Sequence, residues 1–249
     1  MNQFLRAGLA AASLFAAPAL ADTAVVPGAY ATTDAPSGQF GVFGNPANSP
    51  TTLQFVINAS ELGGIRSGST LTAIGFRFAG SPYTDPQGAA NFTNYSIQIG
   101  SARRTTSNLS TSFATNMGTD AVIARSGALS IAAGSFADQP GNGPNPFYDV
   151  GFTTPYVYDG GDLAVTLRFT PASGNPAIVV DAFTADSRIN TVFAFGNASA
   201  TSGTVGQAFA PVTRFTFAAV PEPASWALMI GGFGMIGGTV RRRRVASAA

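Results

Sequence analysis

The sequence predicts an all-β protein whose body is a β-sandwich of the jelly-roll type. Apolar and polar residues alternate with a period of two over many short runs, which is typical of half-buried strands. Gly, Pro, Asn, Asp and Ser bound these runs and favour turns between them. Most of the 20 phenylalanines lie in the middle of the 249-residue chain, where they can fill the layer between two sheets.

The first 21 residues have the features of a signal peptide. Arg6 supplies a positive charge, and residues 7–17 form an apolar run too short to span a bilayer. Ala19 and Ala21 then complete an A-x-A cleavage pattern. We therefore predict a signal peptide over residues 1–21 and Asp22 as the first residue of the exported protein.

Residues 22–220 are predicted to form one β domain. The clearest strand places Leu163, Val165, Leu167 and Phe169 on one face and polar or small residues on the other. Further strands are predicted at 52–58, 74–78, 95–99, 120–125, 147–153, 177–183, 191–196 and 212–217, with a single helical turn at 59–62. The Pro- and Gly-rich stretch 138–149 is interpreted as a long loop within the domain, because strands follow it without a change in composition.

Composition excludes several classes of function. The chain contains no cysteine, histidine or lysine, so thiolate and histidine chemistry, Schiff bases and zinc-thiolate sites are excluded. Only 10% of residues are charged, and residues 22–220 carry eight arginines against eleven acidic residues, a net charge of −3. Because no basic patch is visible, we expect no nucleic-acid partner.

The C-terminal part of the chain predicts a transmembrane helix over residues 224–240. This stretch has no charged residue and spans about 25 Å as a helix, close to a thin hydrocarbon core. Trp226 at its start suits the headgroup region, and the cluster Arg241–Arg244 at its end favours the cytoplasmic side. The body is therefore expected outside the cytoplasm, with residues 245–249 as a short cytoplasmic tail.

Residues 221–244 also combine a Pro-Glu-Pro triplet, a Trp-Ala pair, a Gly-Phe-Gly and a basic cluster. The residues concerned are Pro221, Glu222, Pro223, Trp226, Ala227, Gly232, Phe233, Gly234, Arg241, Arg242, Arg243 and Arg244. This order resembles the PEP-CTERM sorting signal in its PEPxxWA form. The resemblance implies that an exosortase, a membrane-embedded enzyme similar to transpeptidases, recognises the segment and cuts near Pro-Glu-Pro. It also implies a link with exopolysaccharide production. A permanent single-span anchor in the inner membrane is the alternative to cleavage.

Three segments of the body resemble uncharacterised PEP-CTERM proteins. They are residues 141–169, 186–196 and 211–217. This second resemblance carries no known activity, so it implies relatives without implying a function.

Paired carboxylates are the remaining catalytic chemistry, because a glycosidase needs two at a defined separation. The candidates are Asp149, Asp159, Asp162, Asp181 and Asp186. Asp159 and Asp162 bracket two glycines, a pattern that favours ordinary turn chemistry, with a calcium site as the alternative. We expect no catalytic residues, no metal centre and no other cofactor.

Two further groups suggest carbohydrate binding. Tyr156 and Tyr158, beside Asp159 and Asp162, are candidates for a sugar-stacking platform, although core or edge packing is favoured. The adjacent arginines at 103–104 are candidates for contact with an acidic polysaccharide, against the simpler interpretation of a solvated edge.

The sequence as a whole indicates an exported bacterial surface or matrix protein that acts structurally or adhesively and is not an enzyme. Its expected partners are an exosortase, the inner membrane through the C-terminal helix, and exopolysaccharide in a biofilm. The body is expected in the periplasm first, and then at the cell surface or secreted. The alternatives are a lectin-like carbohydrate-binding module, assisted by calcium, and a glycoside hydrolase that uses aspartates.

Overall fold

The computed structural model describes residues 21–39, 41–44, 49–83, 88–139, 143–206 and 209–220, and these are nearly all β. The strands are β1 (Ala21–Val26), β2 (Ser37–Gln39), β3 (Thr51–Ile57), β4 (Thr70–Arg77), β5 (Ala90–Ser101), β6 (Val122–Arg125), β7 (Leu129–Ile131), β8 (Phe147–Val157), β9 (Leu163–Pro171), β10 (Val180–Thr184), β11 (Ile189–Phe195), β12 (Thr204–Val205), β13 (Phe209–Pro211) and β14 (Thr213–Ala218). One short helix, α1 (Phe113–Asn116), and two 3-10 turns (Gly28–Tyr30 and Ala59–Leu62) complete these segments. The predicted all-β class is confirmed.

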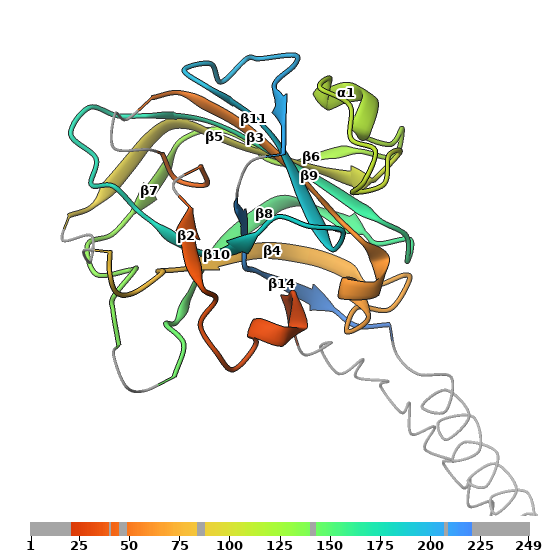
Figure 1. Cartoon of the computed structure of the whole chain (residues 1–249), viewed down its shortest axis with the longest axis horizontal. Coiled ribbons are helices and arrows are strands. Elements are labelled where there is room, and N and C mark those ends of the chain that lie inside the picture. The colour runs from red at the N-terminus through yellow and green to blue at the C-terminus, as the bar shows by residue number, and fades with distance from the viewer. Residues whose placement is uncertain are drawn as a thin grey trace, which may run out of the picture.

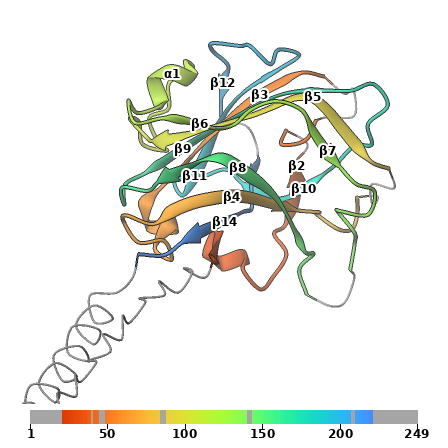
Figure 2. The same cartoon turned by 180° about the vertical axis from the view of Figure 1, so that it is seen from behind.

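Two antiparallel sheets face each other across the core (Figures 1 and 2). The seven-stranded sheet has the order β12-β11-β3-β9-β5-β6, with β7 also paired to β5, and the four-stranded sheet has the order β1-β14-β4-β8. A small sheet, β13-β10-β2, lies beside them. Apolar side chains from both large sheets form one buried cluster, as the period-two pattern requires. The comparison with a jelly roll stays a prediction.

Strand β9 shows why these residues form strands, and it also corrects one expectation. Leu163, Val165, Leu167 and Phe169 are fully buried, as their alternation predicts. Thr166 on the opposite face is buried as well, at 1% exposure. The segment that carries α1 covers this outer face and joins it through buried hydrogen bonds, so the central strands are buried on both sides.

Strand β8 is longer than predicted, because it continues past residue 153 to Val157 and includes Pro155. Proline has no backbone N–H to contribute to a ladder, so it is tolerated in an edge strand. Strand β8 is the edge of the four-stranded sheet, which explains the continuation. The turn predicted at 59–62 is present as a 3-10 turn, and the Asn58 side chain accepts a hydrogen bond from the Ser60 N–H at its start.

The first and last described strands pair with each other. Strand β1 runs antiparallel to β14, with Ala21 opposite Ala218 and Val26 opposite Thr213. Because the partners are antiparallel, the beginning of β1 and the end of β14 lie at the same end of the sheet (Figure 2). The two ends of the body therefore leave it side by side.

Several predictions fall outside the described residues. They are the signal peptide before Ala21, the transmembrane helix over 224–240 and the tail over 245–249. In the part of the chain that is described, no helix is long and apolar enough to cross a membrane.

Candidate functional site

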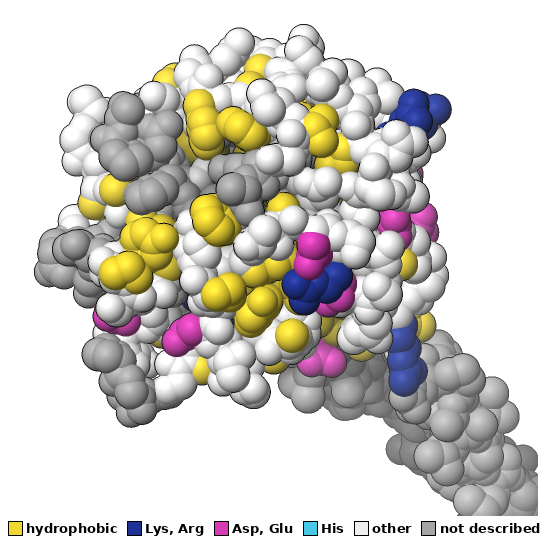
Figure 3. Space-filling model, viewed as in Figure 1, with side chains coloured by type: hydrophobic (Ala, Val, Ile, Leu, Met, Phe, Trp, Pro, Cys, Tyr) yellow, Lys and Arg dark blue, Asp and Glu magenta, His cyan; other side chains and the backbone are white. Residues whose placement is uncertain are grey.

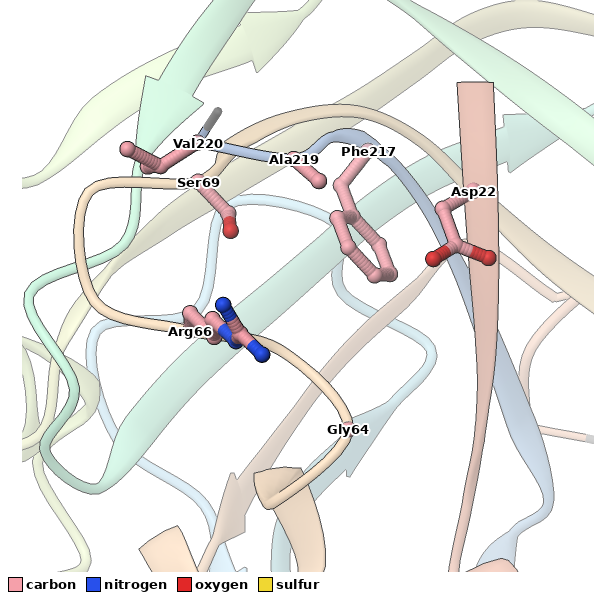
Figure 4. A pocket seen from close by; sticks show the side chains of 7 residues that line it. All are labelled: Asp22, Gly64, Arg66, Ser69, Phe217, Ala219 and Val220. Atoms are coloured by element: carbon pink, nitrogen blue, oxygen red, sulfur yellow. The ribbon is translucent and has the colours of Figure 1, made fainter. Parts of the chain in front are cut away.

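A pocket of about 260 Å³ lies where β1 begins and β14 ends (Figure 4). We call it the junction pocket, and its lining residues are Asp22, Gly64, Arg66, Ser69, Phe217, Ala219 and Val220. Asp22 comes from β1 and Phe217 from β14, opposite each other in the ladder. The remaining lining residues come from the loop before β4 and from the two residues after β14.

A tight turn brings Arg66 and Ser69 to the same side of the pocket. The Ser69 N–H donates to the Arg66 carbonyl at 3.0 Å, and Gly68 between them has a φ of +87°. A turn of this kind needs glycine at its third position. The Gly68 N–H also donates to the Tyr158 carbonyl at 2.7 Å, which anchors the turn to the end of β8. The Arg66 guanidinium and the Ser69 hydroxyl consequently point into the same hollow (Figure 4).

One polar group of the junction pocket is left unsatisfied by its surroundings. Ser69 is fully buried, yet its hydroxyl has no hydrogen-bond partner among the described residues. A buried hydroxyl without a partner costs about 1–3 kcal/mol. The Asp22 carboxylate accepts a hydrogen bond from the Thr23 N–H at 2.8 Å. The lining of the pocket thus includes the Arg66 side chain and a buried hydroxyl that no hydrogen bond of the described residues uses.

The residues after β14 pack closely on this turn. A Cβ atom at Gly68 would lie 3.1 Å from the Val220 Cγ2 atom, so the glycine leaves room for the passing chain. The Phe217 ring, 2% exposed, belongs to the apolar core below the pocket. The path of the chain out of the body is therefore fixed as far as Val220.

The tyrosines considered for a sugar platform lie in the core. Tyr156 and Tyr158 are 3% and 2% exposed, so neither presents a ring face to a sugar, and the prediction of a stacking platform is wrong. The Tyr156 hydroxyl donates to the Asp120 carboxylate at 2.6 Å, and the Tyr158 hydroxyl donates to the Gly161 carbonyl at 2.8 Å. Burial raises the pKa of Tyr156 and raises that of Tyr158 to about 12. Packing, the favoured interpretation, is observed.

The acidic residues of the β8–β9 turn support the backbone. The Asp159 carboxylate accepts the Gly161 N–H at 2.9 Å, and the Asp162 carboxylate accepts the Ala59 N–H at 2.8 Å. The first is the turn contact that the sequence favoured, whereas the second joins this turn to the 3-10 turn at Ala59–Leu62. Among the described residues, no three Asp or Glu side chains come together in an arrangement that could hold a metal ion. Calcium binding here stays a prediction.

The other candidate carboxylates form ion pairs. Asp149 pairs with Arg214 at 2.7 Å, and Asp186 pairs with Arg188 at 2.7 Å. Asp181 pairs with Arg77 at 2.6 Å in the core. Each of these three carboxylates is therefore held by an arginine of the fold.

The arginines at 103–104 line a shallow hollow of about 330 Å³ together with Ala114 and Thr115 of α1. Both arginines are exposed, and neither guanidinium makes a hydrogen bond or ion pair with a described residue. Since α1 covers the outer face of the seven-stranded sheet, it lies on the side away from the four-stranded sheet that contains β1 and β14 (Figure 1). Figure 3 shows that charged side chains are sparse on the face it views, among mostly uncharged surface.

These features define a β-sandwich whose first and last described strands meet beside a polar pocket. A family model described as the PEP-CTERM protein-sorting motif matches residues 219–244, so the chain carries a PEP-CTERM sorting motif and the resemblance noted for residues 221–244 is confirmed. The motif implies export to the cell envelope or surface and makes an exosortase the processing partner. Searches of curated proteins and of solved structures gave no match.

The match begins at Ala219, so two lining residues of the junction pocket already belong to the sorting motif. Sequence reasoning identified Asp22 and the motif but missed Arg66 and Ser69. The Arg66-Ser-Gly-Ser69 turn is visible in the sequence, but its position beside the chain ends depends on the pairing of β1 with β14.

Proposed function

We propose that the protein is a structural or adhesive component of the cell surface or of an exopolysaccharide matrix, and that it acts without catalysis. The apolar segment 224–240 holds the protein in the inner membrane until the exosortase releases it. A permanent anchor through the same segment is the alternative. The sorting motif supports the export route, and the structural roles of the aspartates in the body support a non-catalytic action.

One observation carries the adhesive part of this proposal. The chain ends leave the body from the four-stranded sheet, whereas the exposed arginines at 103–104 lie on the outer face of the other sheet. A body held through its C-terminal segment would present this pair of uncommitted guanidinium groups away from the anchor. Guanidinium groups bind carboxylates well, so the chemistry suits an acidic polysaccharide.

The test is co-sedimentation of the purified protein with an acidic polysaccharide, such as alginate, and with a neutral one, such as dextran. We expect binding to alginate that falls at least about fivefold in the variant R103A/R104A and weakens as salt rises. The control variant R125A/R188A removes the same charge elsewhere and should retain binding. Equal loss in both variants, or no binding of the parent protein, would contradict the proposal.

A deletion strain tests the role in the cell. We expect less protein and less polysaccharide retained in the matrix fraction, with normal growth of dispersed cells. Restoration by the parent gene but not by the R103A/R104A gene, at equal abundance, would link the phenotype to this surface. An unchanged matrix in the deletion strain would refute the structural role.

A further inference from the structure

The two arginines at 103–104 belong to a loop that the body anchors at several points. We call residues 103–108 the arginine loop, and it begins two residues after the end of β5. The Arg103 N–H donates to the Asn116 carbonyl of α1 at 2.9 Å, and the Thr106 hydroxyl donates to the Ser187 carbonyl at 2.7 Å. A side-chain amide of β11 also donates to the Thr106 carbonyl, at 2.8 Å. The loop is therefore tied both to α1 and to the start of β11.

A buried polar network fixes the α1 side of this loop on the seven-stranded sheet. Asn116 is fully buried, and its side-chain amide donates to the Gln54 Oε1 atom at 2.8 Å and to the Ser110 carbonyl at 2.9 Å. The Gln54 amide in turn donates to the Phe113 carbonyl and to the Thr166 hydroxyl, each at 2.9 Å. Buried polar groups that are paired in this way favour one arrangement. A loop held by them loses little conformational entropy when a ligand binds.

The exposed side chains of the arginine loop combine two guanidinium groups with neutral polar groups. The exposed residues are Arg103, Arg104, Thr105, Ser107 and Asn108. The Asn108 N–H donates to the Thr105 carbonyl at 3.0 Å, so this turn keeps Asn108 beside the residue that follows Arg104. The hydroxyl oxygens of Thr105 and Ser107 lie 3.2 Å apart. Guanidinium groups only donate hydrogen bonds, whereas hydroxyl and amide groups both donate and accept them.

This combination specifies a ligand more closely than charge does. Guanidinium groups suit a carboxylate, which they can bind through two parallel hydrogen bonds. Hydroxyl and amide groups suit the hydroxyl groups of a sugar ring, which also donate and accept. Asp186 and Arg188, on either side of the anchoring Ser187, pair with each other at 2.7 Å and add no net charge beside the loop. One carboxylate next to free hydroxyl groups is the chemistry of a uronic acid residue.

We propose that the arginine loop binds a hexuronate residue through its carboxylate and its free hydroxyl groups together. The guanidinium groups of Arg103 and Arg104 hold the carboxylate, while Ser107 and Asn108 bond to hydroxyl groups of the same sugar or of the next one. This inference rests on the proposed function and narrows its ligand from an acidic polysaccharide to a polyuronate with unmodified hydroxyl groups. A chain with the same carboxylates but substituted hydroxyl groups binds less tightly.

Two ligands of equal charge isolate the hydroxyl contacts. The purified full-length chain is titrated calorimetrically with a hexamer of mannuronate, and with the same hexamer after O-acetylation, which leaves every carboxylate in place. We expect the parent protein to bind the unmodified hexamer about fivefold more tightly than the acetylated one, since exposed hydrogen bonds contribute modestly.

The variant S107A/N108A should lose this preference, because its affinity for the unmodified hexamer falls to the level of the acetylated one. Both side chains are exposed, so the variant is expected to fold. The control S126A/S130A removes two exposed hydroxyl groups around β7 and should keep the preference of the parent. Salt separates the two kinds of contact. R103A/R104A should flatten the fall of log affinity with log salt concentration, whereas S107A/N108A should lower the affinity at every salt concentration without changing that slope.

The outcomes distinguish this inference from the proposed function. Equal or tighter binding of the acetylated hexamer by the parent, or the same loss for both hexamers in S107A/N108A, would overturn the hydroxyl contacts. The proposed function would still stand if R103A/R104A lost binding to alginate. Binding to alginate without binding to either hexamer would also overturn this inference alone. A parent protein that binds neither alginate nor a hexamer would refute both.

Discussion

The buried ion pair between Arg77 of β4 and Asp181 of β10 allows a quantitative prediction. Both side chains are almost fully buried, and the Arg77 Nε and Nη2 atoms lie 2.8 and 2.6 Å from the Asp181 Oδ2 atom. Arg77 also donates to the Thr33 carbonyl at 2.7 Å, and Asp181 accepts the Ala35 N–H at 3.1 Å. The pair therefore joins the four-stranded sheet to the small sheet and to the segment before β2.

The substitution Arg77→Met replaces the guanidinium by an uncharged apolar side chain and leaves a buried carboxylate without its charged partner. Such a loss costs about 3–5 kcal/mol. At about 2–4 °C per kcal/mol for a domain of this size, Tm should fall by roughly 6–20 °C. The double variant Arg77→Met/Asp181→Leu removes both charges, so it should lose less than the single variant. Circular dichroism during heating measures both.

The pH dependence sharpens this prediction. Burial raises the pKa of Asp181, and the hydrogen bonds and charge of Arg77 oppose that rise. Without Arg77 the pKa in the folded state rises further, so the folded variant holds its proton more tightly than the unfolded chain. The stability that the protonated Asp181 contributes to the variant is then present at low pH and lost as pH rises through the raised pKa of Asp181. The Tm deficit of Arg77→Met should be smaller near pH 4 than near pH 8. A deficit below about 3 °C, or one that does not change with pH, would refute this reasoning.

Three further predictions concern the core, the acid limb of stability and the junction pocket. Phe169→Ala should destabilise the fully buried core by about 3–5 kcal/mol. The control Ile123→Ser, at a side chain that is 49% exposed, should change stability by less than about 0.5 kcal/mol. Similar losses of Tm in the two variants would contradict the assigned core. Burial acts to raise the pKa of Asp120, but hydrogen bonds from Ser101 and other donors outweigh it, so the pKa is lowered in the folded state. The ionised Asp120 carboxylate therefore stabilises the fold above its pKa in the unfolded chain, and this stabilisation is lost as pH falls through its pKa in the folded state. Asp120→Asn should therefore flatten the decline of Tm below about pH 4, and parallel profiles for parent and variant would argue against it. Gly68→Ala forces a positive φ on alanine and brings its Cβ close to the Val220 side chain, so we expect a loss of about 1–2 kcal/mol in thermal unfolding. Unchanged stability of this variant would contradict the turn geometry.

Local alternation explains which parts of the fold were predictable. The runs that became β3, β5 and β9 carry their own period-two signal, so their strands were expected within a few residues. Strand β1 was not expected, because its sequence continues the small apolar composition of the predicted leader. Its partner β14 lies almost the whole body away along the chain, and no local pattern encodes such a pairing.

The candidate sites show the same limit. Tyr156 near the end of β8 and Tyr158 directly after it point to one side, and Val157 between them points to the other. The alternation is clear, but both sides carry large apolar groups. The sequence did not reveal that the tyrosines point inward and that Val157 is 60% exposed. The sorting motif was predictable because its residues are contiguous, whereas Arg66 and Ser69 reach the chain ends only after the sheet has formed.

The placement of β14 between β1 and β4 has a mechanical consequence. If the far face of the body is held and the C-terminal segment is pulled, the force acts along β14 and shears this strand against its neighbours. The ladder bonds to both neighbours stand across that direction, so they resist together in shear instead of unzipping singly. A body attached in this way can carry tension between its C-terminal attachment and a ligand bound on its far face without β14 separating first from its sheet.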